Sequence, residues 1–403
     1  MRHFRFILIP AVLFLLAGYT SAGWVAQNSG TAFSLHSVYF PVDAQTGYTT
    51  GWNGTILKTT NGGANWVSQS RGIDVLLSVH FPLDASTGFA VGGYGAILKT
   101  TNGGVAWDSL NSASQFLNSV HFPLDAQTGY AVGEAGIILK TTNGGTTWLP
   151  QAGGPQNLYA VQFPLDASTG YTVGCYPFSS TILKTTDGGA NWAPQSSGTT
   201  RWLTSVYFPI DASTGYVVGD SGTILKTTDG GGSWVAQTSG TTVWLRSVCF
   251  PLDASTGYAV GGGGGVNTIL KTTNGGANWV GQSSGTTNWL GSVHFPVDAL
   301  TGYVVGNNGT ILKTTDGGAS GVEENAEGRG QRLEVRITAR PNPFTSFATL
   351  PGHEADRFAL YDISGRRVGV YKGDRIGEGL RAGVYFIRAE KGDRKPLRVV
   401  KVR

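Results

Sequence analysis

The chain repeats itself seven times, and this repetition constrains its fold more than any other feature. A segment that reads Ser37-Val38-Tyr39-Phe40-Pro41 at its first occurrence recurs with its valine at 38, 79, 120, 161, 206, 248 and 293. A second block, Ile56-Leu57-Lys58-Thr59-Thr60, recurs with its lysine at 58, 99, 140, 184, 226, 271 and 313. Steps of 41 to 45 residues between the valines are typical of propellers, in which one unit forms one four-stranded blade.

Each unit divides into four short strands separated by turn residues. The strands are Ser-Val-x-Phe, Gly-Tyr-x-Val-Gly, Thr-Ile-Leu-Lys-Thr, and a fourth that begins at the tryptophan of Ala-Asn-Trp-Val. Proline and an Asp-Ala-x-Thr-Gly turn end the first strand, because proline cannot donate to a ladder. In the Thr-Thr-Asn/Asp-Gly-Gly hairpin, the Asn or Asp tolerates left-handed backbone and the glycines permit a tight turn. No segment keeps a helical period, so the predicted class is all-β.

The two ends of the repeat array complement each other. The seventh unit reaches Gly318 and then lacks its tryptophan strand, whereas the segment from Trp24 to Gly30 matches the segment from Trp234 to Gly240. We therefore expect residues 24–29 to form the outer strand of the last blade. With Trp24 in this closure strand, the first and last blades join and the ring has no unpaired gap.

Composition and charge exclude several classes of protein. Glycine and proline number 61 and 16, or 77/403 = 19%, which is below the roughly 25 to 30% typical of low-complexity disorder. Residues 24–318 hold ten Lys and Arg against fourteen Asp and Glu, whereas residues 319–403 hold seventeen against eleven. A mildly acidic body argues against a nucleic-acid partner. Two cysteines, Cys175 and Cys249, are too few for a disulfide scaffold, and we expect buried or isolated thiols.

The first 22 residues have the features of a secretory signal. Arg2 and Arg5 precede an apolar run from Phe6 to Ala17, and small residues follow up to Ala22. We predict a signal peptide over residues 1–22 with cleavage after Ala22; an uncleaved anchor is the alternative. No later stretch is apolar enough to span a bilayer, so we expect no transmembrane segment in the mature chain.

The hairpin octet from Thr59 to Trp66 resembles an Asp-box, the hairpin of sialidases, sortilin-type receptors and some glycosidases. Over residues 24–318 the full unit is similar to the photosystem II assembly and stability factor family, which are seven-bladed propellers. The resemblance implies a propeller over residues 23–318 and a structural role for one box residue in each blade: Asn61, Asn102, Asn143, Asp187, Asp229, Asn274 and Asp316.

After a linker at 319–332, the composition shifts to Arg and Glu, and apolar residues alternate between glycine turns. This pattern predicts a small β-sandwich over 333–403. Arg340-Pro341-Asn342-Pro343-Phe344 and three further C-terminal motifs look like the type A sorting domain of the type IX secretion system. The resemblance implies the type IX machinery as a partner and a location at the cell surface or outside the cell. A generic β-sandwich accessory domain is the alternative.

A candidate site is sought where the repeats differ. In a propeller, the connections between strands one and two and between three and four share one face, and here they are nearly invariant. The other connections vary, and variable loops on a repeated scaffold favour binding. Arg71 and Arg201 belong to this second face, and we place Arg246 in one of its loops too. Trp202, Trp244 and Trp289 occupy equivalent positions there in blades 5 to 7, so an aromatic, cationic platform for a protein or glycan ligand is one interpretation. Packing between blades is the other.

Several repeated polar residues favour structural roles. The turn aspartates and the lysines occur in all seven units, which predicts turn capping or Asp–Lys pairing rather than catalysis. His80, His121 and His294 share one strand position in blades 2, 3 and 7, which does not predict a metal site. We expect neither a metal nor a cofactor.

The carboxylates outside the repeats do not single out a catalytic pair. They are Asp74, Asp108, Glu134 and Asp220, and a glycosidase needs two carboxyl groups held about 5 to 9.5 Å apart. The sequence therefore favours an exported, non-catalytic binding or assembly platform. An Asp-box glycoside hydrolase and a structural surface component without a ligand are the alternatives. The photosystem role is not transferred, because the sorting tail implies a different location.

Overall fold

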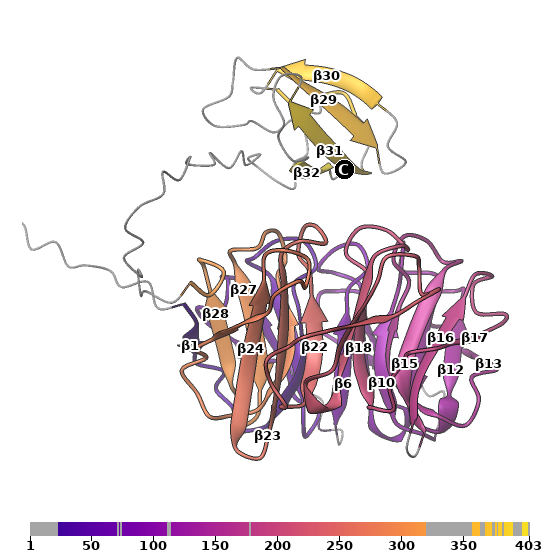
Figure 1. The fold of residues 1–403 in the computed structure, drawn as a ribbon. Helices are drawn as coiled ribbons and strands as arrows, with labels where there is room; N and C mark the ends of the chain where they lie inside the picture. The colour runs from indigo at the N-terminus through magenta and orange to yellow at the C-terminus, as the bar shows by residue number, and fades with distance from the viewer. Residues whose placement is uncertain are drawn as a thin grey trace, which may run out of the picture.

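The computed structural model describes residues 23–70, 72, 75–110, 114–176 and 179–319, and in the C-terminal part 357–362, 367–372, 375–376, 378–380, 383–389 and 397–401. Within 23–319, seven four-stranded antiparallel sheets surround one axis and form a seven-bladed propeller (Figure 1). The all-β class is thereby confirmed. The predicted signal peptide and all of the linker beyond Ala319 lie outside the described residues, and so do Arg71, Asp74 and the Arg340–Phe344 motif.

In blades 1 to 6 the strands follow one another along the chain from the inside of the ring to the outside, whereas blade 7 takes its outer strand from the N-terminal segment. Blades 1 to 3 comprise β2 (Leu35–Tyr39), β3 (Gly47–Gly51), β4 (Ile56–Thr59) and β5 (Val67–Ser68); β6 (Leu76–His80), β7 (Gly88–Gly92), β8 (Ile97–Thr100) and β9 (Asp108–Ser109); and β10 (Leu117–His121), β11 (Gly129–Gly133), β12 (Ile138–Thr141) and β13 (Leu149–Gln151).

Blades 4 and 5 comprise β14 (Asn157–Gln162), β15 (Gly170–Tyr176), β16 (Ser179–Thr185) and β17 (Ala193–Gln195); and β18 (Leu203–Tyr207), β19 (Gly215–Gly219), β20 (Ile224–Thr227) and β21 (Val235–Gln237). Blades 6 and 7 comprise β22 (Leu245–Cys249), β23 (Gly257–Gly263), β24 (Val266–Thr272) and β25 (Val280–Gln282); and β26 (Leu290–His294), β27 (Gly302–Gly306), β28 (Ile311–Thr314) and β1 (Val25–Gln27). Three short 3₁₀ turns are η1 (Gly93–Gly95), η2 (Glu134–Gly136) and η3 (Asp220–Gly222).

Aromatic side chains connect each blade to the one before it. The phenylalanine after the first strand stacks on the Tyr or Phe of the preceding blade's second strand; Phe40 lies 3.9 Å from Tyr303, ring centre to ring centre. The blade's own tryptophan meets this phenylalanine edge-on, as Trp66 does at 6.1 Å. A Cβ on Gly47 would lie 2.4 Å from the Phe40 ring, so glycine begins the second strand because no side chain fits there.

Hydrogen bonds reinforce the contacts between blades. The Tyr48 hydroxyl donates to the carbonyls of Ala85 and Gly103 in the next blade. The Lys58 ammonium donates to the same Gly103 carbonyl at 2.8 Å and lies 5.5 Å from the centre of the Tyr48 ring. All seven repeated lysines donate to a glycine carbonyl of the following blade, Lys313 doing so to Gly62 of blade 1. The lysines therefore link neighbouring blades.

The N-terminal strand pairs with the seventh blade. Val25, Ala26 and Gln27 of β1 lie opposite Lys313, Leu312 and Ile311 of β28. Trp24 is buried, meets Phe295 edge-on at 6.0 Å, and donates its indole N–H to Gln282 Oε1 at 3.0 Å. On the inner side, β26 packs against β2.

The C-terminal part contains a further four-stranded antiparallel sheet, separate from the seven of the propeller. Its order is β30 (Arg367–Lys372), β29 (Arg357–Asp362), β31 (Gly383–Ala389) and β32 (Leu397–Lys401). Phe358, Leu360, Tyr385 and Ile387 form its core with Ile376. The second layer that a β-sandwich requires is not among the described residues. Of the described helices, none is long and apolar enough to cross a membrane.

Candidate ligand-binding face

Two faces of the propeller have different chemistry. We call the face formed by the turns between first and second strands and by the box hairpins the repeat face. The face formed by the other connections is the variable face, and the long β23–β24 hairpin of blade 6 projects from it at the lower edge of Figure 1.

The turn aspartates of the repeat face cap their own turns. Asp43 Oδ1 accepts hydrogen bonds from the backbone N–H groups of Gln45 and Thr46, both at 2.9 Å. The same pair of bonds occurs in every blade. These bonds contribute to the lowered pKa of Asp84 and Asp166, although burial opposes them. The carboxylates thus stabilise the turn in each blade.

Hydrogen bonds also hold the box hairpins in shape. Thr59 Oγ1 accepts the N–H of Gly63, and Asn61 Oδ1 accepts the N–H of Asn65. The N–H of Asn191 is the main cause of the lowered pKa of Asp187, about 2. The positive φ angles of the hairpin fall on both glycines, 65° at Gly62 and 84° at Gly63, and Asn61 does not use the left-handed backbone that its residue type tolerates. The side chain at Asn61 serves as a hydrogen-bond acceptor instead.

Exposed aromatic side chains gather on the variable face. Among the described residues, the large aromatic side chains that are exposed all lie in its connections or at their edges: Phe33, Trp52, Tyr94, Tyr176, Trp202 and Trp289. The exposed aliphatic side chains lie elsewhere with one exception, Val266 at the tip of a hairpin. Aromatic rings bury large areas on binding with little loss of side-chain freedom, so this face is suited to holding a ligand.

Four of the five predicted site residues are joined by ring contacts. The Trp202 and Trp244 rings lie 5.7 Å apart in an edge-to-face arrangement. The Arg246 guanidinium carbon lies 4.8 Å from the centre of the Trp244 ring and 5.5 Å from that of Trp289. Trp202 and Trp289 are each 37% exposed and Trp244 is half-buried. We call these four residues the Trp–Arg cluster.

A β-bulge directs Arg246 into this cluster. In every blade the pairing of the first two strands shifts after the initial leucine, which leaves the next residue without a partner. Bulges re-aim side chains and are frequent beside functional sites. The bulged residue differs in every blade, and the seven are His36, Leu77, Asn118, Tyr159, Thr204, Arg246 and Gly291.

The surroundings of Arg246 are poor in hydrogen-bond acceptors. Its Nε is buried without a hydrogen-bond partner among the described residues, and so are Trp244 Nε1 and His36 Nε2. Burial lowers the pKa of the Arg246 guanidinium. Burial, and secondly the charge of Arg246, lower the pKa of His36 to about 4. At neutral pH the bulge positions of blades 6 and 1 therefore offer one cation and one neutral imidazole.

Arg201, a further predicted site residue, does not join the cluster contacts. Arg201 lies in the connection before β18, and its guanidinium is 3.9 Å from the Asp220 carboxylate with both side chains well exposed. Such a surface ion pair contributes little to the free energy of unfolding. Our placement of Arg246 in a loop is wrong, because the residue belongs to β22. Arg71 lies outside the described residues.

The three histidines of the first strands surround the propeller axis near the repeat face. The ring centres of His294, Tyr39, His80 and His121 follow one another at 4.9, 4.8 and 4.9 Å. Burial lowers the pKa of all three histidines, to about 4 for His121 and His294. Within the described residues, no group of three or more His, Cys, Asp or Glu side chains could hold a metal ion. Cys175 and Cys249 are free and buried.

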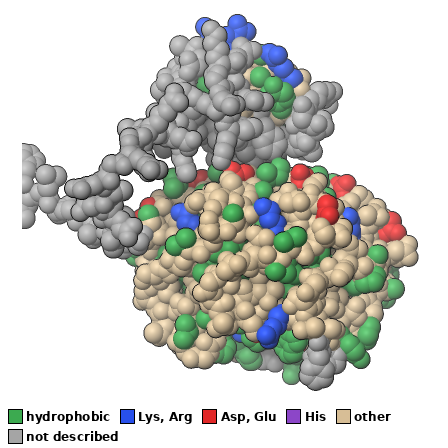
Figure 2. Space-filling model, viewed as in Figure 1, with side chains coloured by type: hydrophobic (Ala, Val, Ile, Leu, Met, Phe, Trp, Pro, Cys, Tyr) green, Lys and Arg blue, Asp and Glu red, His purple; other side chains and the backbone are tan. Residues whose placement is uncertain are grey.

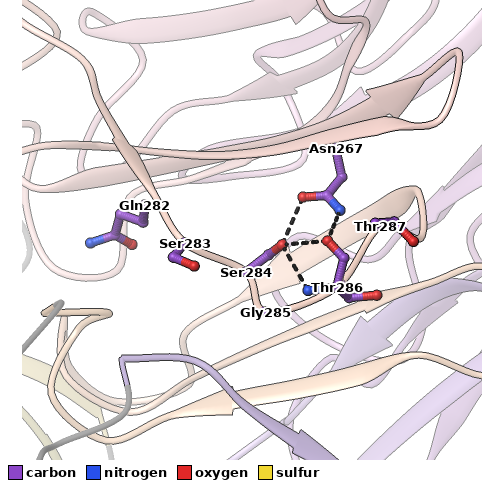
Figure 3. A pocket seen from close by; sticks show the side chains of 7 residues that line it. All are labelled: Asn267, Gln282, Ser283, Ser284, Gly285, Thr286 and Thr287. Atoms are coloured by element: carbon purple, nitrogen blue, oxygen red, sulfur yellow. Dashed lines mark hydrogen bonds between the residues drawn. The ribbon is translucent and has the colours of Figure 1, made fainter.

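Two polar grooves lie beside the long hairpins of blades 6 and 4, with volumes of about 640 and 630 Å³. Figure 3 shows the blade 6 groove, where Asn267 contacts Ser284 and Thr286. Ser284 donates to Asn267 Oδ1, and Asn267 Nδ2 donates to the Thr286 carbonyl. These polar groups satisfy one another, so the groove has a structural explanation.

The carboxylates outside the repeats come from separate elements. Asp108 is on the outer strand β9, Glu134 is in η2 of blade 3, and Asp220 is in η3 of blade 5.

Our sequence analysis missed two residues of the variable face. Trp52, in a turn of blade 1, is 48% exposed, and its ring lies 6.3 Å from that of His36. The second missed residue is His36. The residues at the positions of Trp52 and His36 vary among seven otherwise similar repeats, and this variation could have identified both.

Comparisons with known proteins indicate the relatives of this chain. The family model described as "Photosynthesis system II assembly factor YCF48" matches residues 71–152 and 149–236. No match is found among curated proteins. The solved structure "YCF48 bound to D1 peptide" is 20% identical with a TM-score of 0.60, over 73% of this chain and 97% of that one. YCF48 from Cyanidioschyzon merolae is 19% identical with a TM-score of 0.59, over 72% and 98%.

A glycoside hydrolase has a similar fold. The GH74 enzyme of Niastella koreensis is 19% identical with a TM-score of 0.61, and the match covers 74% of this chain and 54% of that one. At such low identities these structures establish a shared propeller fold and no shared activity. By its family match, the chain is similar to YCF48-type assembly factors over blades 2 to 5.

Proposed function

We propose that the protein is a non-catalytic binding or assembly platform whose variable face holds a protein or glycan ligand. The observation that carries this proposal is the Trp–Arg cluster, in which two part-exposed tryptophans flank a third tryptophan and Arg246. Tryptophan rings stack on sugar rings and apolar side chains, and a guanidinium donates to carboxylate or carbonyl oxygens. A YCF48 structure contains a peptide, which supports a protein segment as one class of ligand.

The remaining features of the proposal concern assembly and export. The N-terminal strand β1 acts as the closure strand of the ring, and the box hairpins act as Asp-boxes that brace each blade. Residues 1–22 direct export, and residues 333–403 act as a type A sorting domain that engages the type IX secretion machinery. The protein would then act at the cell surface or outside the cell. The motifs described above support these assignments.

The proposal is tested by binding with matched variants. The mature chain is screened against peptide and glycan arrays, including xyloglucan and sialylated oligosaccharides, beside Trp202→Ala/Trp289→Ala and Arg246→Gln. We expect both variants to bind a hit at least about tenfold more weakly. The control is Val235→Ala/Val280→Ala on exposed outer-strand positions, which should bind as the native chain does. Equal retention by all variants would remove the site.

The native chain and a further variant, Glu134→Gln, test the enzyme alternative. A hydrolysed glycan in the native sample, with hydrolysis lost in Glu134→Gln, would establish a glycosidase and overturn the non-catalytic proposal. A sample that binds neither class of ligand would leave a structural surface component as the better description.

A further inference from the structure

The repeat face carries large aliphatic side chains that its turns do not require. The residue between the proline and the aspartate is aliphatic in all seven blades. In blades 2 to 5 this residue is exposed, by 62% at Leu83, 54% at Leu124, 45% at Leu165 and 44% at Ile210. Proline ends the strand and aspartate caps the turn, so turn chemistry alone would accept a polar residue between them. We call these four side chains the apolar arc.

The surroundings of the apolar arc are acidic. Each arc residue is followed directly by a turn aspartate, and the box residues Asp187 and Asp229 of blades 4 and 5 lie on the same face. The four repeated lysines of blades 2 to 5 donate to glycine carbonyls between the blades and offset part of this charge. Six aspartates against four lysines leave a net charge of −2 around the arc. Figure 2 shows acidic and hydrophobic side chains along the upper edge of the propeller. An aliphatic patch with this rim selects a basic partner with apolar surface.

The chain itself contains such a partner. Residues 319–403 hold seventeen Lys and Arg against eleven Asp and Glu. In the C-terminal sheet, Arg357, Arg367 and Lys372 are exposed. The propeller ends at Ala319, whose N–H bonds to Asp316 in the box of blade 7. The chain therefore leaves the propeller on the repeat face.

We propose that the apolar arc is the docking surface for the basic C-terminal domain of the same chain. A second copy of the propeller would bring two acidic repeat faces together, and an anionic membrane would meet the same repulsion. Covalent linkage raises the effective concentration of the C-terminal domain at this face. While docked, the domain would cover the arc and leave the variable face open.

The test is carbodiimide cross-linking of the full mature chain, followed by mass spectrometry. This zero-length reagent joins carboxylates to amines in contact. We expect cross-links within one molecule between the turn aspartates of blades 2 to 5 and lysines of the tail, such as Lys372 or Lys401. Their yield should fall when salt is raised from about 0.05 M to about 1 M, because the Debye length shortens to about 3 Å.

Two quadruple variants isolate the arc. Replacing Leu83, Leu124, Leu165 and Ile210 by serine should reduce the cross-link yield more than about tenfold, because the buried apolar area is lost. The matched control replaces Val67, Leu149, Val235 and Val280 by serine, since these outer-strand residues are 59 to 65% exposed. The control should keep the native yield, and thermal melts of both variants verify folding.

The remaining outcomes overturn the proposal. They are an unchanged yield in the arc variant, tail cross-links to the variable face, cross-links only between molecules, or no cross-links. Cross-links between isotopically labelled and unlabelled chains would identify a second copy as the occupant. Ligand binding at the Trp–Arg cluster is measured separately, so failure here leaves the proposed function standing.

Discussion

Single serines connect the innermost strands of the propeller. The Ser37 hydroxyl accepts the backbone N–H of Val79 in the next blade at 3.3 Å. Serine hydroxyls of five further blades accept equivalent bonds of 3.2 to 3.4 Å from valine N–H groups. Blade 4 has Ala160 at this position, which offers no oxygen to Val206 of blade 5. One of seven repeated bonds is thus missing because of one residue.

This gap predicts a stabilising substitution. Ala160→Ser should raise the free energy of unfolding by about 1 kcal/mol, the usual net contribution of a hydrogen bond. Ser119→Ala, which removes an existing bond to Val161, should lower it by a similar amount. Urea unfolding at neutral pH measures both changes. If Ser119→Ala destabilises and Ala160→Ser does not, blade 5 satisfies the Val206 N–H in another way.

The repeated residues were largely predictable at this scale, and the reason is their number. Seven copies of Asp43 and Lys58 indicate structural work, because one ligand site would not need seven equivalents. The sequence did not reveal which bonds these residues make. The partner of Lys58 is a backbone carbonyl 45 residues away, and no residue type marks a carbonyl. The sequence also did not decide which box residues take left-handed backbone, because Asn61 and the glycines both tolerate that conformation. The structure places it at Gly62 and Gly63.

At the scale of elements, the N-terminal strand differs from the other outer strands. The chain enters β1 directly from the N-terminal side, whereas every other outer strand follows the third strand of its own blade. Trp24 donates its indole N–H to Gln282 Oε1. The indole nitrogens of the six equivalent tryptophans have no hydrogen-bond partner among the described residues. A side-chain bond to blade 6 thus holds the one outer strand that enters from outside its blade.

We expect Trp24→Ala to detach this strand. The substitution should lower the free energy of unfolding by about 3 to 5 kcal/mol, as for other buried tryptophans. It should also raise amide hydrogen exchange at Val25–Gln27 and Ile311–Thr314. Trp107→Ala, at the equivalent position of blade 2, serves as the control, because its strand stays covalently tied to both neighbours. A comparable loss of stability with unchanged exchange in β1 would show that Trp24 fills space without holding the strand.

The bulge explains why the candidate site was only partly predictable. The Ser-Val-x-Phe motif places the start of the first strand at Ser247 in blade 6, but the strand begins at Leu245. Arg246 therefore appeared to be a loop residue, whereas the bulge holds it inside the strand and beside Trp244. The three tryptophans were found because they occupy one repeat position. His36 was missed because a bulged residue carries no sequence motif of its own.

At the scale of the whole molecule, side chains around the axis link neighbouring blades. His121 Nδ1 accepts the N–H of Phe163 in the next blade, and His294 Nε2 contacts the Phe40 carbonyl. Blade 4 has Gln162 at this position, and its amide both accepts from and donates to the backbone of Phe208. A glutamine can therefore occupy this ring without carrying a titratable proton.

The histidines make the stability of the propeller depend on pH. Burial lowers the pKa of His80, His121 and His294 below the ordinary value of 6.5. The unfolded chain therefore binds more protons between about pH 4 and 6.5, and stability falls as pH falls through this window. Each histidine should contribute a loss of up to about 2 kcal/mol between pH 6.5 and 5. The turn aspartates with lowered pKa values matter only below this range.

Substitutions that remove or add an axial histidine test whether these histidines cause the pH dependence. The triple variant His80→Gln/His121→Gln/His294→Gln should lose less unfolding free energy between pH 7 and 5 than the native chain, measured by urea unfolding at each pH. Gln162→His should lose more, because it adds a fourth buried histidine. His36 at the other end of the first strands also has a lowered pKa, but it is common to all variants and does not affect the comparison. Equal pH dependence in the native chain and the triple variant would assign the acid sensitivity to groups outside this ring.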